Sequence, residues 1–191
     1  MSALILPPLV RLRRFRRRCG YGVHSPYAFE FITQVIYERT HYYAYNSLDA
    51  LLPRWQTWLN LRPRRLMRLI FRLANWQHPS CMRLLHPTPQ VFEALKAAVP
   101  SSSMETDTDQ VARDECKADL IYVGARAEAE AREVLRGGCP AMLIVDDLRH
   151  QTALWTWLKE HPRTTLTFDL YDLGIVLFDR PLNRMDYVVS F

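Results

Sequence analysis

The sequence lacks any apolar run long enough to cross a membrane, because its longest apolar stretches fall well short of the ~18 residues that a transmembrane helix needs. It also lacks the pattern of a secretory signal, since an apolar patch in residues 1–8 precedes the first arginines instead of following them. We therefore expect a cytoplasmic protein with no membrane span. At 191 residues, 49% of them hydrophobic and 24% charged, the chain has the length and composition of one globular domain with an appendage.

Cysteine is scarce and dispersed. The four cysteines, Cys19, Cys81, Cys116 and Cys139, form no C-x-x-C pair, which argues against a zinc knuckle and against a dithiol redox motif. Four cysteines are also too few for a disulfide scaffold in a chain of this size. We expect free thiols and no metal site.

Acidic residues are absent from the most basic segment of the chain. Residues 11–18 contain six arginines. Without them the chain has 19 basic and 20 acidic residues, so the formal net charge of +5 comes from this one segment. Clustered arginines neutralise phosphates, which predicts an arm that binds an anionic partner such as nucleic acid. A solvated helix face, a tail on an acidic patch and an organellar transit peptide remain as alternatives. The six residues are Arg11, Arg13, Arg14, Arg16, Arg17 and Arg18.

Two amphipathic helices are expected before residue 80. Ser25-Pro26 is a typical helix start, and the apolar residues that follow it share one stripe as far as Glu38. A shorter helix is expected within residues 48–59. Pro63 opens the most regular helix, in which Leu66, Leu69, Ile70, Leu73 and Trp76 recur at spacings of three and four. Arginines line the opposite side of this helix, where we expect a solvated face: Arg64, Arg65, Arg68 and Arg72.

From residue 81 onward, strand patterns alternate with helix patterns. Buried strands are predicted at 81–85, 119–124, 141–145, 164–171, 175–178 and 187–191, with an ambiguous one in 101–109. Helices are predicted from Thr88 to Val99, from Arg126 to Arg136 and from about Leu148 to Glu160. This order predicts an α/β fold, a mostly parallel sheet with helices on both faces and an antiparallel C-terminal edge. We expect residues 1–60 to form the basic arm and a helical extension, and 61–191 the sheet domain.

Three blocks of sequence resemble a known family. They are residues 20–29 (GYGVHSPYAF), 143–147 (LIVDD) and 168–176 (FDLYDLGIV), and they resemble class I S-adenosylmethionine-dependent methyltransferases of the Bacteroidetes type. The resemblance covers the two ends of the chain well and its middle poorly. It implies a three-layer α/β/α Rossmann-like methyltransferase sandwich with a helical N-terminal extension, and S-adenosylmethionine as the cofactor.

The expected cofactor loop departs from the family. After the first strand the family has a glycine-containing loop, which lets backbone amides approach the ligand, whereas this chain has the glycine-free segment 85–89 with two prolines. The resemblance implies that His86 and Thr88 line this loop. It implies that Glu105 or Asp107 holds the ribose, although the acid-rich loop favours a solvent-exposed carboxylate instead. Gly124 stands where the family often has Asp-Gly, so a carboxylate is missing there. The span from Asp107 to Asp119 is also too short for the usual helix and third strand.

Asp146 and Asp147 end the apolar strand at 141–145. The resemblance implies that this pair lies at the carboxyl edge of the sheet and faces substrate, where a carboxylate can act as a base or help to hold a divalent cation. Alternatively, one of them caps the next helix and the other is solvated. We take Asp146 and Asp147 as the candidate catalytic residues, with Asp146 as the base.

These observations leave two hypotheses. In the first, the protein binds S-adenosylmethionine and transfers its methyl group to an unknown acceptor, which requires alignment of the two reactants and a base. In the second, the domain has lost its cofactor and persists as a non-catalytic binding or scaffolding module, a pseudo-methyltransferase whose arginine arm engages the partner. The altered loop, the missing carboxylate and the shortened middle favour the second.

Overall fold

The structure is a computed structural model that describes residues 23–53, 62–106 and 118–191. The chain forms two compact units. The helical unit comprises the described residues up to Trp76, the segment Pro89–Pro100 and the last three residues, Val189–Phe191. The sheet unit comprises Gln77–Thr88 and Ser101–Val188. The arginine arm and Asp107 lie outside the described residues.

The helical unit holds the predicted helix start at Ser25. The Ser25 hydroxyl accepts a hydrogen bond from the Ala28 amide at 3.3 Å, and Pro26 occupies the first helical position. The predicted single α-helix to Glu38 changes its winding after Phe31: the Tyr37 amide donates to the Ile32 carbonyl, five residues back, at 2.9 Å, which makes a π-helical turn. The elements are α2 (Pro26–Phe31), η2 (Ile32–Ile36), α3 (Tyr45–Ala50), α5 (Arg62–Gln77, its last residue in the sheet unit) and α6 (Pro89–Ala98).

Helix α5 confirms most of its predicted apolar stripe and corrects one residue of its arginine face. Leu69, Ile70 and Leu73 are buried, as the spacing predicts, whereas Trp76 is 37% exposed. Arg65 is exposed as predicted, but the prediction of a solvated face is wrong for Arg72, whose side chain is only 6% exposed. Its guanidinium reaches backbone carbonyls of η2, which periodicity within α5 alone cannot reveal. Within the described residues, no helix is both long and apolar enough to cross a membrane.

The sheet unit contains seven strands in the order β2-β1-β3-β4-β6-β5-β7. Strand β6 runs antiparallel between β4 and β5, and the other neighbouring strands pair in parallel. The expected antiparallel component therefore lies in the C-terminal part of the sheet. The bounds are β1 (Cys81–Leu85), β2 (Ser103–Thr106), β3 (Leu120–Val123), β4 (Met142–Asp146), β5 (Thr164–Asp169), β6 (Leu173–Phe178) and β7 (Met185–Val188).

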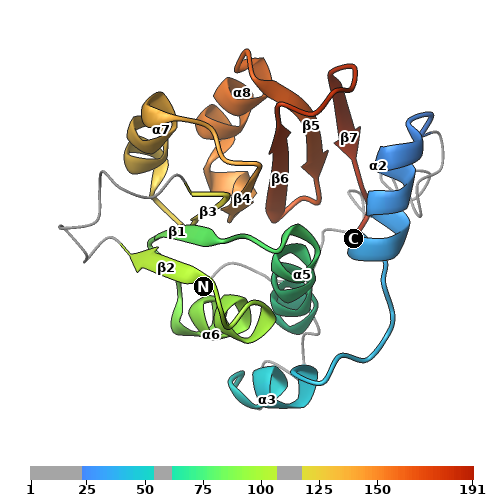
Figure 1. The fold of residues 1–191 in the computed structure, drawn as a ribbon, viewed down its shortest axis with the longest axis vertical. Coiled ribbons are helices and arrows are strands. Elements are labelled where there is room, and N and C mark those ends of the chain that lie inside the picture. Colours follow the sequence, from blue (N-terminus) through green and yellow to red (C-terminus); the bar gives the residue numbers. More distant parts are fainter. Residues whose placement is uncertain (1–22, 54–61, 107–117) are drawn as a thin grey trace. The chain divides into compact units, whose positions relative to one another are not determined.

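Helices α7 (Glu128–Gly137) and α8 (Thr152–Glu160) lie on one face of this sheet (Figure 1). Ala131 and Leu135 of α7 and Leu154 and Leu158 of α8 share one apolar cluster with alternate strand residues such as Val145. Strand residues that point to the other face are buried as well, which is typical of a mostly parallel sheet covered on both sides. The fold is thus the Rossmann-like arrangement that the sequence predicts, a mostly parallel sheet with helices.

The strand order reverses direction between β1 and β3. The chain first places β2 on one side of β1 and then places β3, followed by β4, on the other side. Among the described residues no strand lies outside β2, in keeping with the short span from Asp107 to Asp119. In open α/β sheets, ligands bind at the carboxyl ends of the strands where the order reverses. The point between β1 and β3 is therefore the first place to look for a site.

Candidate functional site at the carboxyl edge of the sheet

Three strands end together at the point where the order reverses. Leu85 of β1 pairs with Val123 of β3, which pairs with Val145 of β4. The residues that follow, His86, Gly124 and Asp146, consequently meet at one edge of the sheet. The sequence analysis selected all three.

The backbone of the segment after β1 occupies the space above Gly124. A Cβ atom added to Gly124 would lie 2.1 Å from the His86 carbonyl oxygen, a separation that side chains essentially never adopt. The Gly124 amide donates to the Leu85 carbonyl at 2.8 Å, and His86 turns the chain with a left-handed φ of 48°. Glycine is required here because the chain approaches itself.

Gln151 holds the backbone of Gly124 through its carbonyl group. Its side chain is 3% exposed, and its Nε2 donates to the Gly124 carbonyl at 3.0 Å and to the Asp146 carbonyl at 2.6 Å. Both backbone polar groups of Gly124 are thus engaged within the protein. Gln151 also interrupts the helix predicted from Leu148 to Glu160, which the structure divides into η3 (Leu148–His150) and α8.

Asp146 has its carboxylate turned into the protein. Tyr122, fully buried on β3, donates its hydroxyl to Asp146 Oδ2 at 2.7 Å, and the Asp147 amide donates to Oδ1 at 2.8 Å. Burial raises the pKa of the Asp146 carboxyl, and the two hydrogen bonds oppose this rise only in part. Burial, together with the charge of Asp146, raises the pKa of Tyr122 well above its usual range.

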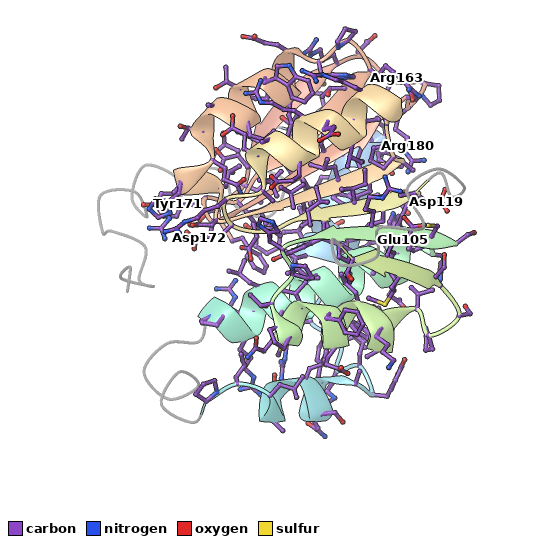
Figure 2. All side chains as sticks on the ribbon, turned by 90° about the vertical axis from the view of Figure 1, so that its left-hand side faces the viewer. Glu105, Asp119, Arg163, Tyr171, Asp172 and Arg180 are labelled. Atoms are coloured by element: carbon purple, nitrogen blue, oxygen red, sulfur yellow. The ribbon has the colours of Figure 1, made fainter. Side chains whose placement is uncertain are left out.

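Two other carboxylates at this edge have partners of their own. Asp147 Oδ1 lies 2.6 Å from Nδ1 of His150. The alternative that one of the two aspartates caps the next helix is not met, since η3 has no side-chain cap hydrogen bond. Asp172 forms an ion pair with Arg149 at 2.8 Å, and Arg149 also lies over the ring of Tyr171. Figure 2 shows Tyr171 and Asp172 at this end of the strands and Asp119 at the other. In the described part of the chain, no group of three or more acidic, histidine or cysteine side chains is arranged to hold a metal ion.

The remaining predicted cofactor residues are dispersed. Glu105 is level with Arg83 on the neighbouring strand, and Arg83 donates to its Oε2 at 2.8 and 3.1 Å. The register aligns this pair with Leu143, three residues before Asp146, which at about 3.3 Å a residue is roughly 10 Å short of the edge. The His86 side chain points to Glu130, at 3.8 Å, and Thr88 is exposed just before α6. The binding roles of these residues stay predictions.

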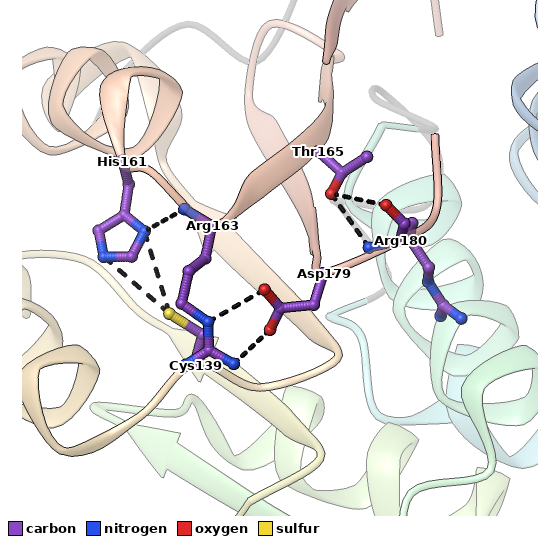
Figure 3. Close-up of polar contacts among 6 residues, drawn as sticks. All are labelled: Cys139, His161, Arg163, Thr165, Asp179 and Arg180. Carbon is purple, nitrogen blue, oxygen red and sulfur yellow. Dashed lines mark hydrogen bonds and ion pairs between the residues drawn. The ribbon is translucent and has the colours of Figure 1, made fainter. Parts of the chain in front are cut away.

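The opposite edge of the sheet unit holds a second polar cluster (Figure 3). Cys139 is buried with its sulfur 4.0 Å from the His161 ring, and the Arg163 Nε donates to Asp179 at 3.0 Å. Burial, aided by the nearby Arg163 charge, lowers the pKa of His161. The Thr165 hydroxyl accepts from the Arg180 amide at 3.0 Å. These contacts join the ends of β5 and β6 and have a structural function.

Sequence reasoning missed Tyr122 and Gln151. Alternation along buried strands carried a signal for Tyr122, because it pairs with Ile144 and so shares a face with Asp146. However, only the pairing register of β3 and β4 brings Tyr122 and Asp146 together, and this register cannot be read from the sequence. Gln151 carried no signal, since its acceptors are backbone groups at the ends of two strands.

Comparisons with known proteins reveal distant structural similarity to methyltransferases. Neither a protein-family model nor a curated protein sequence matches the chain. The solved structure of the Podospora anserina methyltransferase PaMTH1 with SAH aligns at 12% identity and a TM-score of 0.43, over 94% of this chain and 100% of that one. The Bacillus cereus O-methyltransferase with SAH aligns at 12% and 0.43, over 78% and 96%. Cofactor-bound Rv0187 from MTB aligns at 11% and 0.39, over 91% and 98%.

Proposed function

We propose that this protein is a non-catalytic binding module built on a methyltransferase-type fold, one that no longer takes S-adenosylmethionine at its sheet edge. A single observation carries the proposal. At the reversal point between β1 and β3, where such a sheet receives its ligand, the His86 carbonyl lies 2.1 Å from the position of a Cβ on Gly124. This close approach of the chain to itself supports the proposal that the edge no longer receives a cofactor.

The groups available for the cofactor do not fit it. The Gly124 amide and carbonyl are both hydrogen-bonded to protein groups. Pro87 and Pro89 have no N–H to offer, and the Glu105 carboxylate is bound by Arg83. Asp146 is likewise bound by Tyr122, so Gly124, Glu105 and Asp146 are committed to contacts within the fold.

Calorimetric titration of the purified full-length chain with S-adenosylmethionine tests this proposal. We expect no saturable heat at millimolar ligand, from protein whose folded state is verified by circular dichroism in the same buffer. Saturable binding that is altered by Asp146→Asn would overturn the proposal. It would favour the first hypothesis, in which the protein is an S-adenosylmethionine-dependent methyltransferase. Asp146, with its raised pKa, would then be the candidate base.

The partner of such a module is an anionic molecule engaged by the arginine arm. The support is the sequence alone: Arg11, Arg13, Arg14, Arg16, Arg17 and Arg18 have no acidic residue among them, and they lie outside the described residues. Deleting residues 1–18 should lower the salt concentration at which the protein elutes from a heparin column. Unchanged elution would remove the arm from the proposal.

A further inference from the structure

The helical unit contains a cavity of about 520 Å³ that no step of the proposed function uses. We call it the arginine pocket, because Arg39, Arg65, Arg68 and Arg72 line it, together with the rings of Tyr45 and Phe191. It lies entirely within this unit, between the end of η2, α3, α5 and the last residues of the chain. Its volume falls in the range of sites for small molecules.

Arg72 brings a buried positive charge to this pocket. Its Nε donates to the Val35 carbonyl at 2.7 Å, its Nη2 to the Ile36 carbonyl at 3.0 Å and its Nη1 to the Tyr45 hydroxyl at 3.0 Å. These three acceptors are neutral, and they use three of the five N–H groups of a guanidinium. Within the described residues no carboxylate lies at ion-pair distance from Arg72, although its charge contributes to the lowered pKa of the Glu38 carboxyl in the same pocket. A charge buried in this way is costly unless an anion compensates it.

The neighbouring cations outnumber the side-chain carboxylates. Arg68 pairs with Asp49, with Nε to Oδ1 at 3.1 Å, and its guanidinium lies 4.5 Å above the centre of the Tyr45 ring. Asp49 is shared with Arg64, which also pairs with it. Glu38, the one acidic residue among the pocket's lining, accepts from the Thr40 amide at 2.6 Å instead of pairing with an arginine of the described chain. Four arginine side chains thus line the pocket beside one side-chain carboxylate.

We propose that the arginine pocket binds a small organic phosphate. Guanidinium groups match the geometry of phosphate oxygens and remain charged at any physiological pH, so several of them around one cavity select a multiply charged anion. The Tyr45 and Phe191 rings give the pocket an apolar side for the organic part of the ligand. The inference does not rest on the closed sheet edge, because the pocket belongs to the other unit.

Titration of the full-length protein with pyrophosphate and with adenosine diphosphate tests the inference. We expect both to bind, and the uncharged adenosine not to bind at the same concentration. Arg39→Gln removes an exposed pocket cation and should weaken pyrophosphate binding about tenfold or more, the equivalent of one charge-assisted hydrogen bond. Arg136→Gln makes the same change of charge on exposed helix α7 and should leave binding unchanged.

Three outcomes would overturn the inference. They are the absence of pyrophosphate binding at millimolar concentration, equal losses in Arg39→Gln and Arg136→Gln, and binding that neither Arg39→Gln nor Arg65→Gln reduces. The last outcome would assign the phosphate to another part of the chain, such as the arginine arm. Thermal melts of each variant verify that it is folded. The S-adenosylmethionine titration uses another ligand, so a failure there leaves this result intact.

Discussion

The carboxyl edge of the sheet and the arginine pocket use their polar groups in opposite ways. At the edge, each carboxylate has its own partner: Asp146 has Tyr122, Asp147 has His150 and Asp172 has Arg149. In the pocket, a buried guanidinium meets only neutral acceptors around an open cavity. Paired carboxylates have little to offer a ligand, although Gln151 Oε1 at the same edge has no hydrogen-bond partner, whereas a cavity lined by several arginines favours the binding of an anion. The difference directs the search for function away from the place that the fold suggests.

The largest expected effect tests whether the sheet edge is closed. Gly124→Ala puts a methyl group 2.1 Å from the His86 carbonyl, so the loop or the strand end must move, and we expect a loss of about 3 kcal/mol or more in the free energy of unfolding. Denaturant unfolding measures it. Gly137→Ala is the matched control, because no atom lies within 4 Å of its added Cβ, and it should change stability by under about 1 kcal/mol. Equal losses of stability in the two variants would show that the His86 carbonyl does not approach Gly124 this closely.

The next effect separates charge from geometry in the arginine pocket. Arg72→Lys keeps the positive charge but loses the planar fork that serves two carbonyls and a hydroxyl at once. We expect the free energy of unfolding to fall by about 1–3 kcal/mol, since buried acceptors lose their donors. Arg136→Lys, on an exposed face, should have almost no effect. Equal free energies of unfolding in the two variants would contradict the role of the Arg72 hydrogen bonds in stability.

A smaller, pH-dependent effect concerns Asp146. Since its pKa is raised in the folded protein, its contribution to stability is complete below the unfolded value of about 4 and is lost as pH rises through the folded value. Asp146→Asn keeps an acceptor for Tyr122 but cannot ionise. Unfolding free energies measured between pH 4 and pH 7 should therefore shift in favour of the variant as pH rises. A constant difference across this range would contradict the raised pKa.

The smallest effect lies outside both regions. The pKa of His161 is lowered by burial and by Arg163, so its contribution to stability is present above about pH 6.5 and is lost as pH falls through the folded value. His161 is partly exposed, and we expect only a slight change. Melting temperatures at pH 7.5 and 5.5 should differ less in His161→Gln than in the original protein. A larger difference in melting temperature in the variant would contradict the lowered pKa of His161.

The strands and their polar ends could be predicted from the sequence, because apolar runs and the residues that stop them are local signals. Met142 to Val145 and the Asp146 that follows were found in this way. The closure above Gly124 was anticipated only in part: two prolines and no glycine suggested a filled loop. The approach of the His86 carbonyl depends on how β1 and β3 pair, which no local pattern encodes.

The arginine pocket escaped sequence analysis for a different reason. The helical period places Arg72 on the polar stripe of α5, and this pattern is normally right about which face meets water. Here the acceptors lie 36 and 37 residues earlier, on the backbone of η2. Backbone carbonyls carry no signature in the sequence. A buried cation that bonds to them is therefore predicted as a solvated one.

Arg72 donates hydrogen bonds to the carbonyls of Val35 and Ile36 at the end of the π-helical turn η2. One side chain thus contributes both to the charge of the arginine pocket and to the stability of this turn. A mutation that neutralises this guanidinium would remove one of the four arginine charges that line the pocket and would leave both carbonyls without their donor. Substitution of Arg72 is therefore constrained twice, by the charge of the pocket and by the geometry of the turn.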